Sequence, residues 1–278
     1  PCLFGIDLHW LPHVHGALEV ARILNEQHPD IPVVFGGLSA SYFSSELTTL
    51  ESVDYVITGA TGERPMHCLL EAVKGERSLA EVPDLMWQHD GQVRTAETSW
   101  NPTDLDHANF RPGTLMRQVV KERDPLSITP YAGWWNDPVV PVMTVKGCRR
   151  ECATCGGSCT GYFSATGKKE PIHRSPGNTA QNVRDIAAFS RGPIFLIGDL
   201  REPGGQYARK ILRRLRALDV PNEFVFELFS PAEGDFLFDL GQSVSNWTLE
   251  LSPESHDPEV RSAHDPCATY SNRQMEAT

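Results

Sequence analysis

A cluster of cysteines near the middle of the chain constrains its fold more than any other feature. Cys148, Cys152 and Cys155 are spaced C-x3-C-x2-C, and with Cys159 they account for four of the seven cysteines. An apolar segment precedes this cluster, and a glycine pair follows the third cysteine. Cysteines this close together in sequence cannot all fill a hydrophobic core. The spacing therefore predicts that they bind a metal ion or an iron–sulfur cluster.

Composition argues against several other classes of protein. The 278 residues suffice for two domains, and no apolar run is long enough to span a membrane. The formal net charge of -11 argues against a nucleic-acid-binding protein, whose surface is normally basic. The remaining cysteines, Cys2, Cys68 and Cys267, are scattered singly, so we expect buried thiols in a cytoplasmic protein. The chain begins with Pro1, and we expect that residues preceding it are missing.

Apolar strands alternate with amphipathic helices in residues 1–76. The predicted elements are strands at 3–8, 31–35 and 53–57 and helices at 17–24, 39–50 and 65–74. This alternation predicts parallel β-α units in an α/β, doubly wound (Rossmann-like) sheet that the chain enters partway through. Gly36, Gly37, Ser39 and Gly59 follow two of these strands, at the edge where open α/β sheets bind ligands.

Residues 77–138 show no clean periodicity. Segments 86–89 and 92–95 flank Asp90-Gly91, a dipeptide that favours a tight two-residue turn, and they predict a β-hairpin. Large apolar residues are too frequent for a flexible linker, so we expect an ordered connector between two domains.

Residues 139–278 contain a second β-α series. The predicted elements are strands at 139–146, 193–197, 223–229 and 247–251 and helices at 178–189, 206–218, 234–241, 258–263 and 271–276. We expect the N-terminal part of a parallel (β/α) barrel that is truncated at Thr278. The cysteines would then follow its first strand, at the end of the barrel where chemistry takes place.

Thiolates are soft ligands, which favour an iron–sulfur cluster or zinc over magnesium or calcium. Three of them can hold three irons of a [4Fe–4S] cluster and leave the fourth iron open. Lys146, Arg149 and Arg150 flank the cysteines, and their charge would offset that of the thiolates. Gly156 and Gly157 would let the backbone approach a ligand closely. A structural zinc site with Cys159 as the fourth ligand is the alternative.

The strand, the C-x3-C-x2-C loop and the β-α units after it resemble the radical S-adenosylmethionine (radical SAM) enzymes. The segments VVFGGLSASYF (33–43) and VDYVITGATGE (53–63) resemble the second half of the cobalamin-binding domain found in one subgroup of these enzymes. The segment LELSPESHDPEVRSAHD (249–265) resembles the fourth barrel strand of the family and the loop after it. The resemblance extends over most of the chain.

The resemblance implies an enzyme in which Cys148, Cys152 and Cys155 bind a [4Fe–4S] cluster. The open iron would chelate S-adenosylmethionine (SAM), which is cleaved to methionine and a 5′-deoxyadenosyl radical. Cobalamin would be a second cofactor, and methyl transfer is the commonest reaction in the subgroup. An electron donor such as flavodoxin or ferredoxin is implied, while the substrate, a small molecule or a peptide, is not identified. We expect no membrane or nucleic-acid partner.

Further residues are implied to contact these cofactors. Those near SAM are Gly198, Asp199, Ser252, Glu254 and Ser255, and those near the cobalamin tail are Gly36, Gly37, Ser39 and Gly59. The family has Gly-Gly-Glu where this chain has Gly198-Asp199-Leu200, and a structural role for Asp199 is the alternative. Because the later barrel strands are absent, we expect little turnover from residues 1–278 alone. The alternative function is a non-catalytic protein with a four-cysteine zinc site or an electron-transfer cluster.

Overall fold

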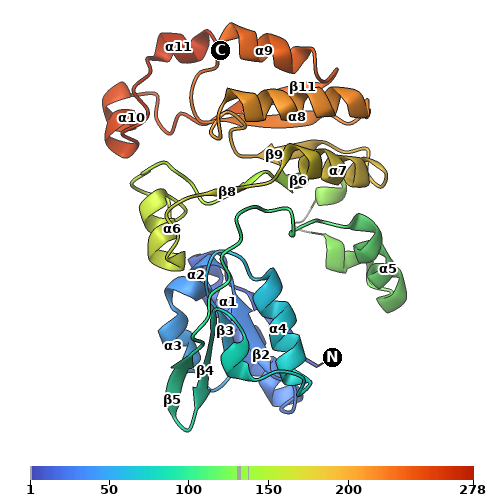
Figure 1. The fold of residues 1–278 in the computed structure, drawn as a ribbon, viewed down its shortest axis with the longest axis vertical. Helices are drawn as coiled ribbons and strands as arrows, with labels where there is room; N and C mark the ends of the chain where they lie inside the picture. Colours follow the sequence, from blue (N-terminus) through green and yellow to red (C-terminus); the bar gives the residue numbers. More distant parts are fainter. Residues whose placement is uncertain (1, 130–132, 137) are drawn as a thin grey trace. The chain divides into compact units, whose positions relative to one another are not determined.

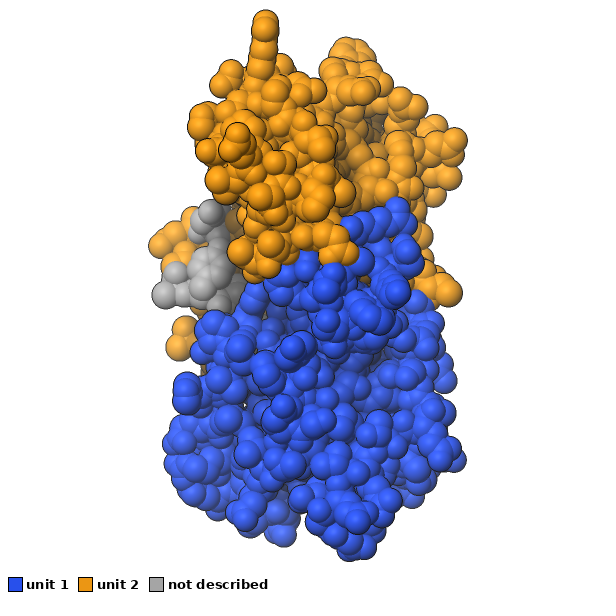
Figure 2. All heavy atoms as spheres, turned by 90° about the vertical axis from the view of Figure 1, so that its left-hand side faces the viewer, with its two compact units in different colours: residues 1–102, 147–149, 155–171 blue, residues 103–146, 150–154, 172–278 orange. Residues whose placement is uncertain are grey.

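The computed structural model describes residues 2–129, 133–136 and 138–278. These residues form two compact units, coloured separately in Figure 2. Unit 1 comprises residues 1–102, 147–149 and 155–171, and unit 2 comprises residues 103–146, 150–154 and 172–278. Residues 130–132 and 137, which belong to the predicted connector, lie outside the described residues.

Unit 1 contains a five-stranded sheet with the strand order β1-β2-β3-β4-β5 (Figure 1). Its strands are β1 (Phe4–Asp7), β2 (Val33–Gly36), β3 (Tyr55–Ile57), β4 (Leu85–His89) and β5 (Gln92–Thr95). The first three strands are parallel, and β4 and β5 join as an antiparallel hairpin. Asp90 and Gly91 both have positive φ at its turn, so the hairpin predicted from this dipeptide is confirmed.

Two layers of side chains show that helices cover both faces of this sheet. Val33 and Phe35 of β2 pack in one cluster with Ala21 of α1, whereas Val34 packs in another cluster with Leu69 of α4. Successive strand residues point to opposite faces, so both faces of β2 are buried. This is the doubly wound arrangement that the sequence predicts.

The helices of unit 1 are short, apart from the first and the fourth. They are the α-helices α1 (Val14–Gln27), α2 (Leu38–Tyr42), α3 (Ser44–Thr48), α4 (Glu63–Val73) and α6 (Cys159–Thr166) and the 3-10 helices η1 (Leu11–His13) and η2 (Leu79–Glu81). The continuous helix predicted at 39–50 is wrong, because Phe43 leaves the helical conformation. The segment is rich in serine, and Ser41 donates its hydroxyl to Gly37 O, a competing bond that weakens helices.

Unit 2 is built on a parallel sheet with the strand order β11-β10-β9-β6. Its strands are β6 (Val140–Met143), β9 (Ile194–Ile197), β10 (Phe224–Leu228) and β11 (Trp247–Leu251), and a separate antiparallel pair is formed by β7 (Val145–Lys146) and β8 (Ile172–His173). The single strand predicted at 139–146 is therefore wrong. At Thr144 the chain leaves the sheet: its hydroxyl donates to Ile197 O, and its carbonyl accepts from Arg174 N–H.

The helices of unit 2 include the five that the sequence predicts. They are α5 (Pro112–Glu122), α7 (Pro176–Ala187), α8 (Gly205–Leu218), α9 (Gly234–Gly241), α10 (Pro258–His264) and α11 (Asn272–Glu276), with the 3-10 helices η3 (Pro125–Ile128) and η4 (Trp134–Asn136). Each of α7, α10 and α11 begins at a serine or aspartate whose side chain caps the first turn.

One face of the parallel sheet carries the core of unit 2. Leu196 of β9 and Phe226 of β10 pack there against Val183 of α7, Ile211 of α8 and Leu240 of α9. The alternate strand residues, which point to the opposite face, are only half-buried. A parallel sheet with helices on one face and a half-open second face is half of a (β/α) barrel, as the sequence predicts.

Throughout the described residues, no helix combines the length and the apolar character that crossing a bilayer requires.

Candidate functional site

The three predicted cluster ligands lie on the irregular loop between β7 and α6. Cys148 and Cys152 are half-buried and Cys155 is exposed, and in the described part of the chain no cysteine forms a disulfide. Ser158 ends the loop: its hydroxyl caps α6 by accepting Gly161 N–H at 3.2 Å, and its own N–H donates to Cys155 O at 3.1 Å. The helix start thus fixes the backbone next to the third cysteine.

The chemistry of these side chains fits an iron–sulfur cluster. Three soft thiols on a short loop outside the three hydrophobic clusters match the type of ligand that such clusters of iron and sulfur bind. Among the described residues, no three His, Cys, Asp or Glu side chains are already grouped to hold a metal ion. Because sites of this kind assemble together with their metal, the donor set and not a preformed cage supports the assignment.

Cys159 differs from the other three cysteines of the cluster. It is the first residue of α6, and its Sγ lies 3.8 Å from Lys169 O, a distance typical of a weak thiol hydrogen bond. This contact favours a structural role over a fourth metal ligand.

The scattered cysteines are not all buried. Cys68 lies in the core of unit 1, as predicted, but Cys2 and Cys267 are exposed, so the prediction of buried thiols is wrong for these two. Cys267 lies in a turn after α10.

The basic side chains that flank the cysteines have different partners. Arg149 is exposed and its guanidinium lies 3.5 Å from Glu170. Arg150 is largely buried and forms ion pairs with Asp265 and Glu202. The prediction that its charge offsets the thiolates therefore does not hold for Arg150, because two carboxylates already match that charge.

Gly198 and Asp199, predicted to contact SAM, follow β9. Gly198 has φ +93°, and a Cβ there would lie 2.4 Å from Val145 Cγ1, so the turn accepts only glycine. Asp199 is buried: its Oδ1 accepts Arg201 N–H, and its Oδ2 accepts Phe229 N–H at 3.1 Å. Both oxygens thus have structural partners, which favours the structural alternative, while contact with SAM stays a prediction.

Glu227 is a carboxylate that the sequence analysis missed. It lies on β10, on the half-open face of the sheet, and its Oε2 accepts Gly198 N–H at 2.9 Å. Burial raises the pKa of Glu227, the Gly198 N–H opposes this shift, and the negative charges of Glu250 and Asp199 add to it. A charged residue within the apolar strand Phe-Val-Phe-Glu-Leu was the signal that could have identified it.

Ser252, Glu254 and Ser255 lie on the loop after β11. Ser252 N–H donates to Leu228 O at 3.1 Å, and the Glu254 carboxylate lies 3.4 Å from His264 Nε2. Ser255 O accepts from the fully buried Arg261, which fixes this loop. Because β9, β10 and β11 are parallel, the loop lies at the same edge of the sheet as Gly198 and Asp199.

The residues predicted to contact cobalamin lie at the carboxyl edge of the unit 1 sheet. Gly37 has φ +109°, and a Cβ there would lie 2.8 Å from Asp7 Oδ1 and from His9 N, whereas a Cβ on Gly36 would meet open space. Ser39 donates its hydroxyl to His9 O at 2.9 Å. Gly59 follows β3, which pairs in parallel with β2. The structure thus brings both turns to one edge, and their contact with cobalamin stays a prediction.

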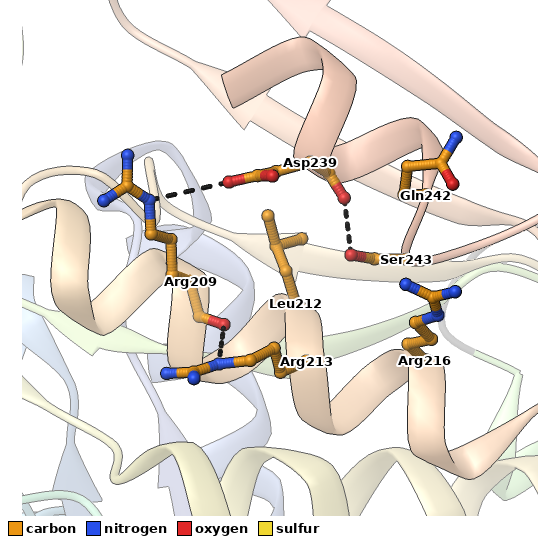
Figure 3. Close-up of a pocket in the computed structure, with 7 residues that line it drawn as sticks. All are labelled: Arg209, Leu212, Arg213, Arg216, Asp239, Gln242 and Ser243. Carbon is orange, nitrogen blue, oxygen red and sulfur yellow. Dashed lines mark hydrogen bonds and ion pairs between the residues drawn. The ribbon is translucent and has the colours of Figure 1, made fainter. Parts of the chain in front are cut away.

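The basic helix α8 pairs with acidic residues of α9. Figure 3 shows Arg209 turned toward Asp239, at 3.5 Å, and the Arg213 side chain bonded back to the Arg209 carbonyl. These residues line a surface cavity of about 240 Å³. Partial pairing with acidic residues at the surface indicates that the basic side chains of α8 form a solvated helix face and not a nucleic-acid-binding surface.

Comparisons with known proteins bear on the fold. No protein-family profile matches the chain. A curated relative, the anaerobic magnesium-protoporphyrin IX monomethyl ester cyclase of Synechocystis sp., is 23% identical over 172 residues, which are 58% of this chain and 32% of that protein.

Solved structures match almost the whole chain. The radical SAM methyltransferase TsrM from Kitasatospora setae, solved with tryptophan and a SAM analogue, matches with a TM-score of 0.70 and 17% identity over 100% of this chain and 54% of that chain. Another structure of TsrM contains cobalamin and a [4Fe–4S] cluster. The cobalamin-dependent SAM radical enzyme OxsB, solved with aqua-cobalamin and SAM, matches with a TM-score of 0.67 and 14% identity over 99% of this chain and 38% of that chain.

These matches confirm the predicted resemblance at the level of the fold. The chain has the mixed α/β fold of TsrM and OxsB over the part that it shares with them. It spans about half the length of TsrM and about a third of the curated relative.

Proposed function

We propose that this chain is the cobalamin- and cluster-binding part of a radical SAM enzyme. The observation that carries the proposal is the three-cysteine loop. It comes shortly after β6, the first strand of the parallel sheet of unit 2, and directly after the short strand β7, in a chain that has the fold of TsrM and OxsB throughout. Similarity of fold alone does not imply function. The proposal therefore depends on the cysteines, which lie on a loop after the first strand of the sheet; in barrel enzymes the catalytic residues lie on loops of this kind.

Cys148, Cys152 and Cys155 would hold the cluster through three irons. When bound, a cluster with an open iron supplies SAM chelation and the electron that cleaves SAM to methionine and a 5′-deoxyadenosyl radical. Gly198 and Ser252, which begin the loops after β9 and β11 at the carboxyl edge of the unit 2 sheet, would help to bind and orient SAM. An external electron donor, such as a flavodoxin or ferredoxin, would reduce the cluster.

Cobalamin would bind at the carboxyl edge of the unit 1 sheet. Gly36 leaves open space there and Gly37 keeps the turn tight, so a cofactor tail can approach the backbone closely. Ser39 and Gly59 lie at the same edge. We infer methyl transfer as the reaction class, because TsrM is a methyltransferase that has been solved with both cofactors.

Metal content tests the proposal most simply. After anaerobic reconstitution with iron and sulfide, the chain should contain about four irons per molecule. Cys152→Ser should lower this content sharply, because it removes one of three ligands, whereas Cys159→Ser should leave it unchanged. Uptake of one zinc per chain with no iron, or equal losses in both variants, would instead support a four-cysteine site.

A further inference from the structure

The two adjacent arginines of the cysteine loop lie in opposite environments. The Arg149 side chain is 57% exposed, and its ion pair with Glu170 measures 3.5 Å. The Arg150 side chain is 15% exposed, and its guanidinium pairs with Asp265 at 2.5 Å and with Glu202 at 3.7 Å. Asp265 is itself 4% exposed. The loop therefore contains two neighbouring arginines, one in a buried ion pair and one exposed, and Arg149 can serve as a control for Arg150.

The partners of Arg150 come from three separate segments of unit 2. Glu202 follows β9, Asp265 follows α10, and the ring of Phe229, just after β10, lies below the guanidinium at 5.5 Å from its centroid. A second bond reinforces this attachment: Ala153 N–H donates to His264 O at 2.9 Å. Residues 150–154 are thus bound both to the carboxyl edge of the parallel sheet and to the loop after α10.

The ion pair is oriented as well as buried. Asp265 Oδ2 accepts a hydrogen bond from the Arg150 guanidinium, and Oδ1 accepts one from Cys267 N–H at 3.0 Å. These two bonds fix the orientation of the carboxylate. A planar guanidinium that binds two carboxylates and stacks on a ring has a geometry that lysine cannot reproduce.

We propose that Arg150 is a positioning residue that holds Cys152 at the carboxyl edge of the unit 2 sheet before any cluster binds. This inference rests on the proposed function. A loop that is already ordered loses less conformational entropy when it takes up a cluster. Arg150 would act through the backbone of residues 150–154, whereas Arg149 contributes charge alone.

Loss of iron to a chelator tests this role. The full chain, reconstituted anaerobically, is mixed with an excess of a ferrous chelator, and iron release is followed by absorbance. Arg150→Met should release iron about 10- to 100-fold faster than the unsubstituted chain, as is typical when groups that orient metal ligands are lost. Arg149→Met, the matched neighbour, should release iron at the unsubstituted rate.

A second control separates positioning from general destabilisation. Val183→Ala weakens the core of unit 2 on α7, far along the chain from the cysteines, and should not change iron release. If Arg150→Met fails to fold, Arg150→Lys and Asp265→Asn are tested in its place. Both should release iron faster than Arg149→Met but more slowly than expected for Arg150→Met. Release no faster than from Arg149→Met, or equal acceleration in Val183→Ala, would overturn the inference.

A measurement on the protein without iron keeps this inference distinct from the proposed function. Iodoacetamide labelling resolved by mass spectrometry should show that Arg150→Met raises the labelling rate of Cys152 and leaves that of buried Cys68 unchanged. If the unsubstituted chain takes up no iron, the proposed function fails. If it holds iron and Arg150→Met changes neither iron release nor labelling, only the positioning role fails.

Discussion

Buried arginine side chains connect separate segments of unit 2. Arg174 is 2% exposed and donates to Met143 O, Asn109 Oδ1 and Ala108 O at 2.6–2.8 Å. Arg261 is fully buried and donates to the carbonyls of Ser255 and Tyr270. A buried polar group without a partner costs about 1–3 kcal/mol, so each such arginine fixes the backbone of the segments that it joins.

Glu227 makes the stability of unit 2 depend on pH. Its pKa is raised in the folded protein, mainly by burial, above the value of 4.5 expected of an unperturbed glutamate. The folded state therefore binds the proton more tightly than the unfolded state does. The stability that protonation contributes is fully present below pH 4.5 and is lost as the pH rises through the raised pKa.

Glu227→Gln should therefore raise the melting temperature more at pH 8 than at pH 5. Glutamine keeps an oxygen for Gly198 N–H but carries no charge to desolvate. Thermal unfolding at both pH values measures this, with Glu97→Gln at an exposed loop position as the control. A gain in melting temperature at pH 5 that equals or exceeds the gain at pH 8 would contradict the account of the Glu227 pKa.

At the scale of single elements, the turn after β2 offers a matched pair of glycines. Gly37→Ala should destabilise unit 1 by about 2–4 kcal/mol, because φ is +109° and the new Cβ would meet backbone atoms at 2.8 Å. Gly36→Ala should change the stability by less than about 0.5 kcal/mol, because its Cβ points into open space. Urea unfolding measures both variants, and equal losses would contradict the description of the turn.

The sequence predicts best the elements that have strong hydrophobic periodicity. Strand β11 and helix α9 match their predicted bounds. The break at Thr144 was not predicted, because it depends on hydrogen bonds to Ile197 and Arg174, which are distant in sequence. Helix α5 was missed because its Pro112-Gly113 start reads as a loop.

In the candidate site too, the sequence predicts local features but not contacts between residues that are distant in sequence. The spacing of the three cysteines identifies them from the sequence, because ligands on one loop are local. The burial of Arg150 and its pairing with Asp265, 115 positions further along the chain, can be seen only in the folded protein. The role of Glu227 is likewise seen only in the folded protein, because its side chain on β10 accepts a hydrogen bond from Gly198, which follows β9.

At the scale of the whole molecule, the chain contains two sheets, and the turns that we propose to contact the cofactors lie at the carboxyl edge of each sheet. Unit 1 presents Gly36 and Gly37, and unit 2 presents Gly198 and the loop after β11. Helical cores support both edges, so the proposed cofactor sites stand on rigid elements. This arrangement suits an enzyme whose cofactors supply the reactive chemistry and whose protein part binds and orients them.

Electron paramagnetic resonance of the reduced, reconstituted chain tests the central claim most directly. If three cysteines hold the cluster and leave one iron open, addition of SAM should shift the signal, because SAM becomes a ligand of that iron. The shift should be absent in Cys148→Ser, which loses a cluster ligand. A chain with about four irons whose signal does not change at saturating SAM would contradict the claim.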